Sequence, residues 1–202
     1  MIYQFKSITP YVHPKAYVHP SATVIGNVEI GKDVYIGPGA ILRGDFGKIE
    51  VGNGANIQEN CIVHMFPGGT VKIKESAHVG HGAIIHGAEL GVNCLIGMNS
   101  VIMDNAIVGD ECIIGALAFV PEGMEIPKRK IVVGNPAKVI KDVSDEMINW
   151  KSEGTAIYQQ LPKEYEESLK EVEPLRFKPK FTPLQKMNYL NLKSIKPTNK
   201  KN

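Results

Sequence analysis

The sequence predicts an all-β solenoid followed by a C-terminal α-helix. Two observations carry this prediction: between Val12 and Ile126 an aliphatic residue returns at every sixth position, apart from a few interruptions, and the residue four places after it is mostly small. A period of six fits neither the 3.6 residues of a helical turn nor the alternation of a plain strand. It does fit short strands that meet at corners, with successive coils stacked on one another.

The aliphatic series has three interruptions: insertions after Leu42 and Val63, and one step that is a residue short before Leu90. We expect its members to point inward. They are Val12, Val18, Val24, Ile30, Ile36, Leu42, Val51, Ile57, Val63, Ile73, Val79, Ile85, Leu90, Ile96, Ile102, Val108, Ile114, Val120 and Ile126. The 20 glycines often follow the aliphatic residue directly, where a turn needs unusual backbone angles.

All three cysteines, Cys61, Cys94 and Cys112, fall on the small-residue position. An odd number without a C-x-x-C pair indicates neither a disulfide framework nor a thiolate zinc site. We therefore expect them to be buried small hydrophobic residues.

Charge and hydropathy bear on location. No apolar run reaches the roughly 20 residues that cross a bilayer, and the N-terminus lacks the pattern of a signal peptide, so a cytoplasmic protein is expected. The net charge is +2, yet residues 176–202 carry eight Lys or Arg and no acid. We expect that tail to be extended and solvated, or to dock on a partner.

The chain after the solenoid contains helix signals. Ser144 is a predicted N-cap, a helix is expected over residues 145–160, Pro162 should break it, and a second helix is expected over 163–171. The predicted division is a β-helix domain at 1–142, a helical segment at 143–175 and a basic tail at 176–202.

Three histidines stand at fixed places in the repeat lattice. The repeats that begin at Leu42, Val63 and Ile85 share one face, so Arg43, His64 and His86 should form a ladder with steps of about 4.8 Å. Two imidazoles at that separation can bind the same metal ion.

His81 lies on the adjoining face and one place later in its repeat. It cannot easily turn the corner to the same ion, whereas a neighbouring subunit could supply it. A closed oligomer is favoured, and three-fold symmetry would match a triangular coil. Three neutral imidazoles with an open fourth position are typical of catalytic zinc.

The repeat pattern over residues 10–140 resembles the hexapeptide-repeat family, which implies a left-handed parallel β-helix. The motifs Arg43-Gly-Asp45, Asn56-Ile-Gln58, His64 and Gly80-His81 to His86-Gly87 resemble the γ-class carbonic anhydrases. The stretches M-N-S-V-I-M-D and D-E-M-I-N-W-K are similar to the branch that contains the phenylacetate-degradation and carnitine-operon proteins.

This resemblance implies a homotrimer with a metal between subunits, held by His64 and His86 of one chain and His81 of the next. The metal would be Zn²⁺, with Fe²⁺ or Co²⁺ as alternatives. It further implies that Arg43 and Asp45 form an inter-subunit ion pair and that Gln58 orients the metal-bound water. Tyr158, on the expected helix, could reach the cleft or simply pack.

The implied activity is that of a metal-dependent lyase or hydrolase, in which metal-bound hydroxide attacks carbon dioxide or a coenzyme A thioester. Two features depart from the carbonic anhydrase pattern: Phe46 stands where that family has an acidic residue, and the loop at 65–69 contains no acid. No proton relay from the metal-bound water is therefore evident. Two alternatives stay open. One is a coenzyme A-dependent acyltransferase with a metal-free histidine base; the other is a non-catalytic accessory of coenzyme A enzymes.

Overall fold

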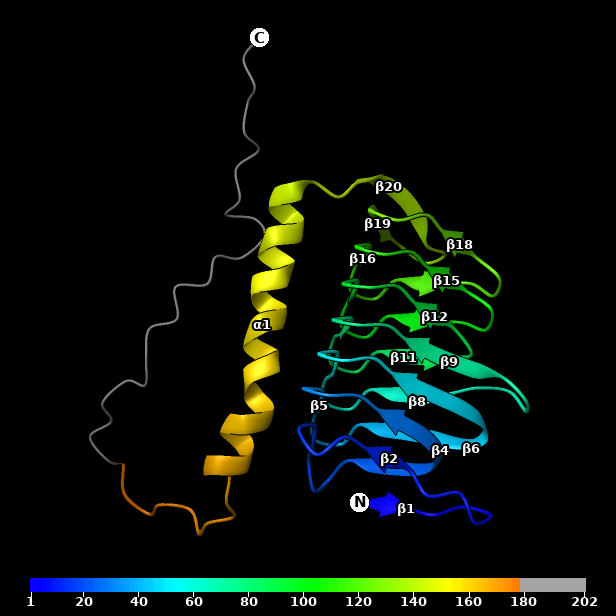
Figure 1. The fold of residues 1–202 in the computed structure, drawn as a ribbon. Coiled ribbons are helices and arrows are strands. Elements are labelled where there is room, and N and C mark those ends of the chain that lie inside the picture. The colour runs from blue at the N-terminus through cyan, green and yellow to red at the C-terminus, as the bar shows by residue number, and fades with distance from the viewer. Residues whose placement is uncertain (179–202) are drawn as a thin grey trace.

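The computed structural model describes residues 1–178 and shows a parallel β-solenoid of about seven turns with a C-terminal helix (Figure 1). The predicted left-handed parallel β-helix of hexapeptide repeats is confirmed. Of the predicted basic tail, residues 179–202 lie outside the described part of the chain. Within residues 1–178, no helix combines the length and apolar character that a membrane crossing requires.

The first sheet has twelve strands and forms two walls of the solenoid. The strands of its main path are, in order, β17 (Phe119–Val120), β14 (Val101–Ile102), β11 (Ile84–His86), β8 (Ile62–His64), β6 (Ile41–Val51), β9 (Thr70–Ile73), β12 (Glu89–Leu90), β15 (Ile107–Val108) and β18 (Glu125–Ile126). Three further strands lie beside β6: β4 (Thr23–Ile30), which pairs with it, and β1 (Ile2–Tyr3) and β2 (Tyr11–Val12), which pair with β4.

The second sheet has eight strands and forms the third wall. Its order is β20 (Lys138–Asp142), β19 (Lys130–Val133), β16 (Ile113–Ile114), β13 (Leu95–Ile96), β10 (His78–Val79), β7 (Asn56–Ile57), β5 (Tyr35–Ile36) and β3 (Tyr17–Val18). All pairings are parallel except β19 with β20, which turns back antiparallel and covers the last coil.

The long strand β6 turns a corner between two walls. Its first residues, Ile41 and Leu42, pair with β8, whereas its last four, Lys48–Val51, pair with β9. We call the wall formed by β17, β14, β11, β8 and the start of β6 the histidine face, and the eight-stranded wall the helix face.

The interior is filled by the predicted aliphatic series. From Val24 to Ile126 every member is buried, and the partly buried Val12 and Val18 pack against this core at its open end. The three cysteines are also buried, as predicted. Burial raises the pKa of Cys61 to about 11 and that of Cys94 to about 12, so both stay protonated at neutral pH.

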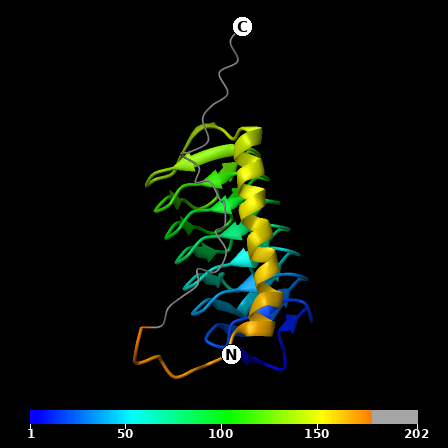
Figure 2. The ribbon, with the colours of Figure 1, turned by 90° about the vertical axis from the view of Figure 1, so that its left-hand side faces the viewer.

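One helix, α1 (Asp145–Ser168), returns along the helix face from the last coil toward the first (Figure 2). Ser144 caps it, and the Ser144 hydroxyl accepts a hydrogen bond from the backbone N–H of Met147 at 3.3 Å. The helix packs against β3, β5 and β7. Near its start, Lys151 Nζ donates to the Ser76 carbonyl at 2.5 Å and to Asn93 Oδ1 at 2.7 Å.

The prediction of two helices separated at Pro162 is wrong, because α1 continues through Pro162 to Ser168. A proline inside a helix removes one backbone hydrogen bond. The turn that follows is held from outside: the Tyr165 ring lies 5.1 Å from the ring of Tyr17 and 5.5 Å from that of Tyr35. Such aromatic contacts offset the lost bond.

Candidate functional site

His64 and His86 stand directly opposite each other on the histidine face, where β8 pairs with β11. The preceding residues, Val63 and Ile85, point into the core, and successive side chains in a strand point to opposite sides. Both imidazoles therefore leave the solenoid on the same side, as the repeat register predicts. Their ring centroids are 5.3 Å apart.

Each of the two rings has its own carboxylate. His86 Nδ1 donates to both oxygens of Asp104, at 2.8 and 2.7 Å, and His64 Nε2 lies 3.2 Å from Asp45 Oδ1. Arg43 donates to the other Asp45 oxygen at 2.8 Å. Arg43 and Asp45 thus pair within one chain, and the inter-subunit ion pair implied by the resemblance stays a prediction.

Burial and a neighbouring positive charge favour the neutral form of the His64 ring. Burial lowers the pKa of His64, and the nearby Arg43 guanidinium lowers it further, against the opposing effect of Asp45. Burial alone would raise the pKa of Asp45, but the hydrogen bond and charge of Arg43 outweigh it and hold that pKa below its usual range. Asp45 is consequently ionised at neutral pH.

The geometry of this pair is compatible with a metal ion. His64 Nδ1 lies 3.3 Å from His86 Nε2. Two nitrogens bound to one tetrahedral zinc at 2.0–2.1 Å lie about 3.4 Å apart. Among residues 1–178, however, no three His, Cys, Asp or Glu side chains are grouped to hold a metal. One chain supplies two of the three predicted ligands, and the zinc site stays a prediction.

His81 lies at the corner between the helix face and the histidine face, in the turn between β10 and β11. Gly82 after it has φ of +70°, and a Cβ at Gly80 before it would come within 2.8 Å of the Ile96 carbonyl oxygen. The G-H-G sequence therefore fits this tight corner. The His81 Nδ1 is paired with Glu59 from the coil before, while the side chain remains 47% exposed. Among residues 1–178, the pairing with Glu59 involves Nδ1 alone and does not occupy the second nitrogen, Nε2.

Gln58 and Tyr158 are not brought to the histidine pair within one chain. Gln58 is 2% exposed and is bonded to Asn56 Oδ1 and to His78 Nε2. Tyr158 of α1 packs its ring against the rings of His78 and Tyr35, at 5.0 and 5.8 Å. His78 is half-buried beneath α1, and burial lowers its pKa to about 3.

Apolar side chains surround the histidine pair on its outer side. The Phe46 ring lies 5.2 Å from the ring of His64, and the Phe66 ring lies 5.0 Å from that of His86. Beside them, Ile41, Ile62 and Ile84 stack in register across β6, β8 and β11, and each remains exposed. This apolar ladder borders the corner that carries His81.

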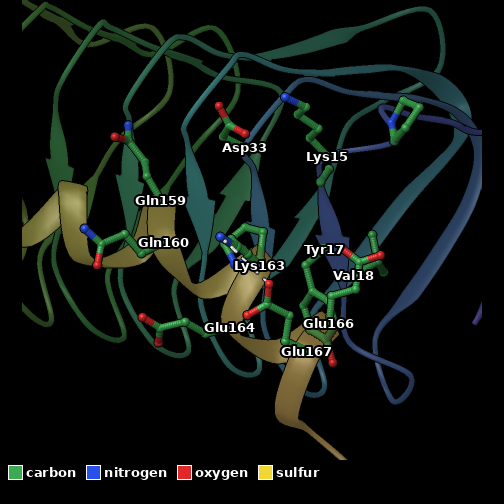
Figure 3. Close-up of a pocket in the computed structure, with 13 residues that line it drawn as sticks. Lys15, Tyr17, Val18, Asp33, Gln159, Gln160, Lys163, Glu164, Glu166 and Glu167 are labelled. Atoms are coloured by element: carbon green, nitrogen blue, oxygen red, sulfur yellow. Dashed lines mark ion pairs between the residues drawn. The ribbon is translucent and has the colours of Figure 1, made fainter.

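A separate pocket of about 910 Å³ lies on the helix face between the first coils and the C-terminal part of α1 (Figure 3). Tyr17 and Lys15 of the first coil line one side, and Gln159, Lys163 and Glu167 of α1 line the other. Lys163 and Glu167 form an ion pair there at 3.8 Å. None of the predicted site residues lines this pocket.

The fold is that of a hexapeptide-repeat protein. The family described as "Bacterial transferase hexapeptide (six repeats)" matches residues 9–44 and 87–121. The chain is 48% identical over 174 residues to the carnitine operon protein CaiE of Escherichia coli O157:H7, covering 86% of this chain and 89% of that protein. The chain therefore belongs to the CaiE family of hexapeptide-repeat proteins.

Two solved structures are similar over most of the chain. One is a hexapeptide transferase family protein from Anaplasma phagocytophilum, with 33% identity and a TM-score of 0.78 over 81% of this chain and 97% of that one. The other is the BC4754 product of Bacillus cereus, named as a candidate acetyltransferase, with 30% identity and a TM-score of 0.81 over 82% and 96%.

These neighbours correct one expectation. The assignment as a metal-dependent lyase or hydrolase, whether carbonic anhydrase-like or a thioesterase, is contradicted, because the similar solved structures are of transferase type. The sequence reasoning also missed Glu59 and Asp104, the carboxylates that hold His81 and His86. Each comes from the coil next to its histidine, so only the stacking of coils reveals the pairing.

Proposed function

We propose that this protein transfers an acyl group from a coenzyme A thioester to a nucleophilic acceptor, with His81 as the general base. The observation that carries the proposal is the pairing of His81 Nδ1 with Glu59 at an exposed corner. A carboxylate on one imidazole nitrogen leaves the other nitrogen unprotonated and able to take a proton. The likeness to a hexapeptide transferase and to a candidate acetyltransferase supports this reaction class.

The reaction requires one proton to pass through the base. His81 Nε2 would remove a proton from the acceptor hydroxyl or amine as its oxygen or nitrogen attacks the thioester carbonyl carbon. The carbon–sulfur bond then breaks, and the departing thiolate takes that proton back from the imidazolium as free coenzyme A. The negative Glu59 stabilises the imidazolium between these two steps.

We also propose that the active species is the predicted homotrimer. An exposed apolar ladder on a stacked wall is a surface that a second copy can cover, and Ile41, Ile62 and Ile84 form one beside the His81 corner. A three-fold arrangement would bring the corner of one chain against the histidine face of the next. The acyl chain would then lie between Phe46 or Phe66 of one chain and His81 of another.

The test compares His81→Ala with His86→Ala, because both remove an imidazole held by a carboxylate. Coenzyme A release from acetyl-CoA and longer acyl-CoA thioesters is measured with and without a panel of amine and hydroxyl acceptors. We expect acceptor-dependent release that survives chelation, falls roughly 10²–10⁴-fold in His81→Ala and changes only a few-fold in His86→Ala.

Two results would overturn the proposal. Release of coenzyme A at the same rate with and without acceptor would show that the reaction is hydrolysis rather than acyl transfer. Equal loss in His81→Ala and His86→Ala, together with loss of a stoichiometric metal from both variants, would make His81 a ligand rather than a base.

A further inference from the structure

Beneath the His81 corner, a connected set of side chains links the exposed histidine to helix α1. Tyr35, on β5, is 1% exposed, and its hydroxyl donates to Glu59 Oε1 at 3.3 Å. The other Glu59 oxygen, Oε2, is paired with His81 Nδ1. One carboxylate therefore joins a buried phenol on one side to an exposed imidazole on the other.

The Tyr35 ring is fixed by aromatic neighbours. It stacks on the Tyr17 ring at 6.1 Å with 13° between their planes. From α1, Tyr158 and Tyr165 lie against it at 5.8 and 5.5 Å. A large aromatic ring held from several sides has little rotational freedom, so its hydroxyl occupies a fixed position.

The Tyr35 hydroxyl can act only as a neutral group at this position. Burial raises its pKa far above the usual value, and Tyr165 and Glu59 raise it further. A neutral phenol donates its proton, and a carboxylate oxygen accepts it. The direction of the bond is therefore fixed: Tyr35 donates to Glu59, and Glu59 accepts from His81 through its second oxygen.

In the described part of the chain, these two bonds hold the Glu59 carboxylate in place. Its side chain is about one-third exposed, at 33%, and it leaves the solenoid at a corner turn where Asn60 adopts a left-handed φ of 60°. A free glutamate at such a position would sample several rotamers. With Oε1 held by Tyr35, Oε2 points at His81 and requires the proton of that imidazole to sit on Nδ1.

We infer that Tyr35 and Glu59 are positioning residues for His81: Tyr35 holds the Glu59 carboxylate, and Glu59 fixes the ring orientation and the Nδ1–H tautomer of His81. The effect on acyl transfer rests on the proposed function, whereas the effect on the imidazole does not. Because Tyr158 and Tyr165 hold Tyr35, the packing of α1 on the helix face sets the state of an imidazole on a different edge of the solenoid.

The test uses Tyr35→Phe and Glu59→Ala, with Tyr17→Phe as the matched control. Tyr17→Phe removes a phenol from the same aromatic stack, but within residues 1–178 the hydrogen bond to Glu59 comes from Tyr35. The ¹⁵N chemical shifts of the His81 ring are measured on the full chain at a pH where the ring is neutral. The signal is assigned by its loss in His81→Ala.

We expect one protonated Nδ1 and one unprotonated Nε2 in the wild type and in Tyr17→Phe. Glu59→Ala should give averaged shifts from mixed tautomers, and Tyr35→Phe an intermediate pattern. In the transfer assay, Tyr35→Phe should lower kcat by a factor between about 3 and about 100, with little change in KM. Tyr17→Phe should stay at the wild-type value.

The inference is overturned if Tyr35→Phe matches Tyr17→Phe in its ring shifts, or if Glu59→Ala leaves the wild-type tautomer unchanged. The surface variant Glu59→Ala keeps the test decisive should Tyr35→Phe fold poorly. A wild type without acyl transfer but with the expected tautomer response would remove the proposed function and leave the positioning of His81 standing.

Discussion

His64 and His86 face each other nitrogen to nitrogen across neighbouring coils, with Nδ1 of the first 3.3 Å from Nε2 of the second. The far nitrogen of each ring is engaged by a carboxylate, Asp45 for His64 and Asp104 for His86. If each neutral ring carries its single proton on the nitrogen that faces its carboxylate, the two unprotonated nitrogens point their lone pairs at each other. Such a place favours a shared proton or a metal cation.

The predicted zinc site can be tested at this pair without an activity assay. We expect Zn²⁺ at 100 times its dissociation constant to stabilise the folded wild type by about 2.7 kcal/mol, seen as a higher midpoint of thermal unfolding. His64→Ala should show no such shift, and His13→Ala, away from the pair, should keep it. A shift that persists in His64→Ala would exclude the pair as the zinc site. Its loss in His81→Ala as well would contradict His81 as a free base.

Acid should destabilise the protein through His78. Burial lowers its folded-state pKa to about 3, against about 6.5 in the unfolded chain. Since the unfolded state binds the proton more readily, the free energy of unfolding should fall as the pH drops from 6.5 toward 3, by at most about 1.4 kcal/mol per pH unit. Urea titrations of wild type and His78→Gln should diverge below pH 6.5. Parallel curves would contradict the assignment.

Alkali should have the opposite effect through Lys151. Burial lowers its pKa from 10.5 to about 8 in the folded state, with Cys94 and Glu111 opposing the shift. The cost of burying the charged amine is fully present below pH 8 and disappears as the pH rises toward 10.5. Stability should therefore rise over that window by at most about 3 kcal/mol, and this rise should be absent in Lys151→Met. Fluorescence of Trp150, the single tryptophan, reports the unfolding of α1. A rise of equal size in both proteins would contradict the prediction.

Two glycine-to-alanine substitutions distinguish the effect of a steric clash from the effect of backbone strain. Gly26 and Gly123 have nearly equal φ, +71° and +68°, but a Cβ at Gly26 would lie 2.7 Å from the Gly44 backbone carbonyl oxygen, whereas nothing lies within 4 Å at Gly123. Both alanine variants have the same backbone strain. Gly26→Ala should nevertheless be less stable than Gly123→Ala by about 1–3 kcal/mol in thermal or urea unfolding. Equal losses would show that the paired strands can relax around the methyl group.

The repeat period predicted the fold because it acts at every coil. In this fold, residues spaced six apart take the same inward position on successive faces. The burial of residues such as Ile57 and Ile96 therefore follows from their spacing alone. The same lattice predicted that His64 and His86 would stand opposite each other. It also predicted that Cys61, Cys94 and Cys112 would be buried, and they are.

The surroundings of each histidine could not be predicted in the same way. Asp104 reaches His86, and Glu59 reaches His81, from neighbouring coils, and those contacts depend on rotamers that a repeat period does not specify. His78 is buried because Tyr158 of α1 packs on it, and Gln58 is bonded to His78. The continuation of α1 past Pro162 depended on Tyr165 packing on the first coils, a contact between distant parts of the chain.

The path of α1 bears on how the molecule comes apart. Its 24 residues give a length of about 36 Å, close to the roughly 34 Å of seven stacked coils. Solenoids held only by nearest neighbours can fray from either end. Here helix α1 begins beside the last coil, and its Lys151 binds Asn93 in a middle coil. Near its end, Tyr165 packs on Tyr17 of the first coil. The terminal coils are thereby tethered to each other, and the stack should melt as one cooperative unit.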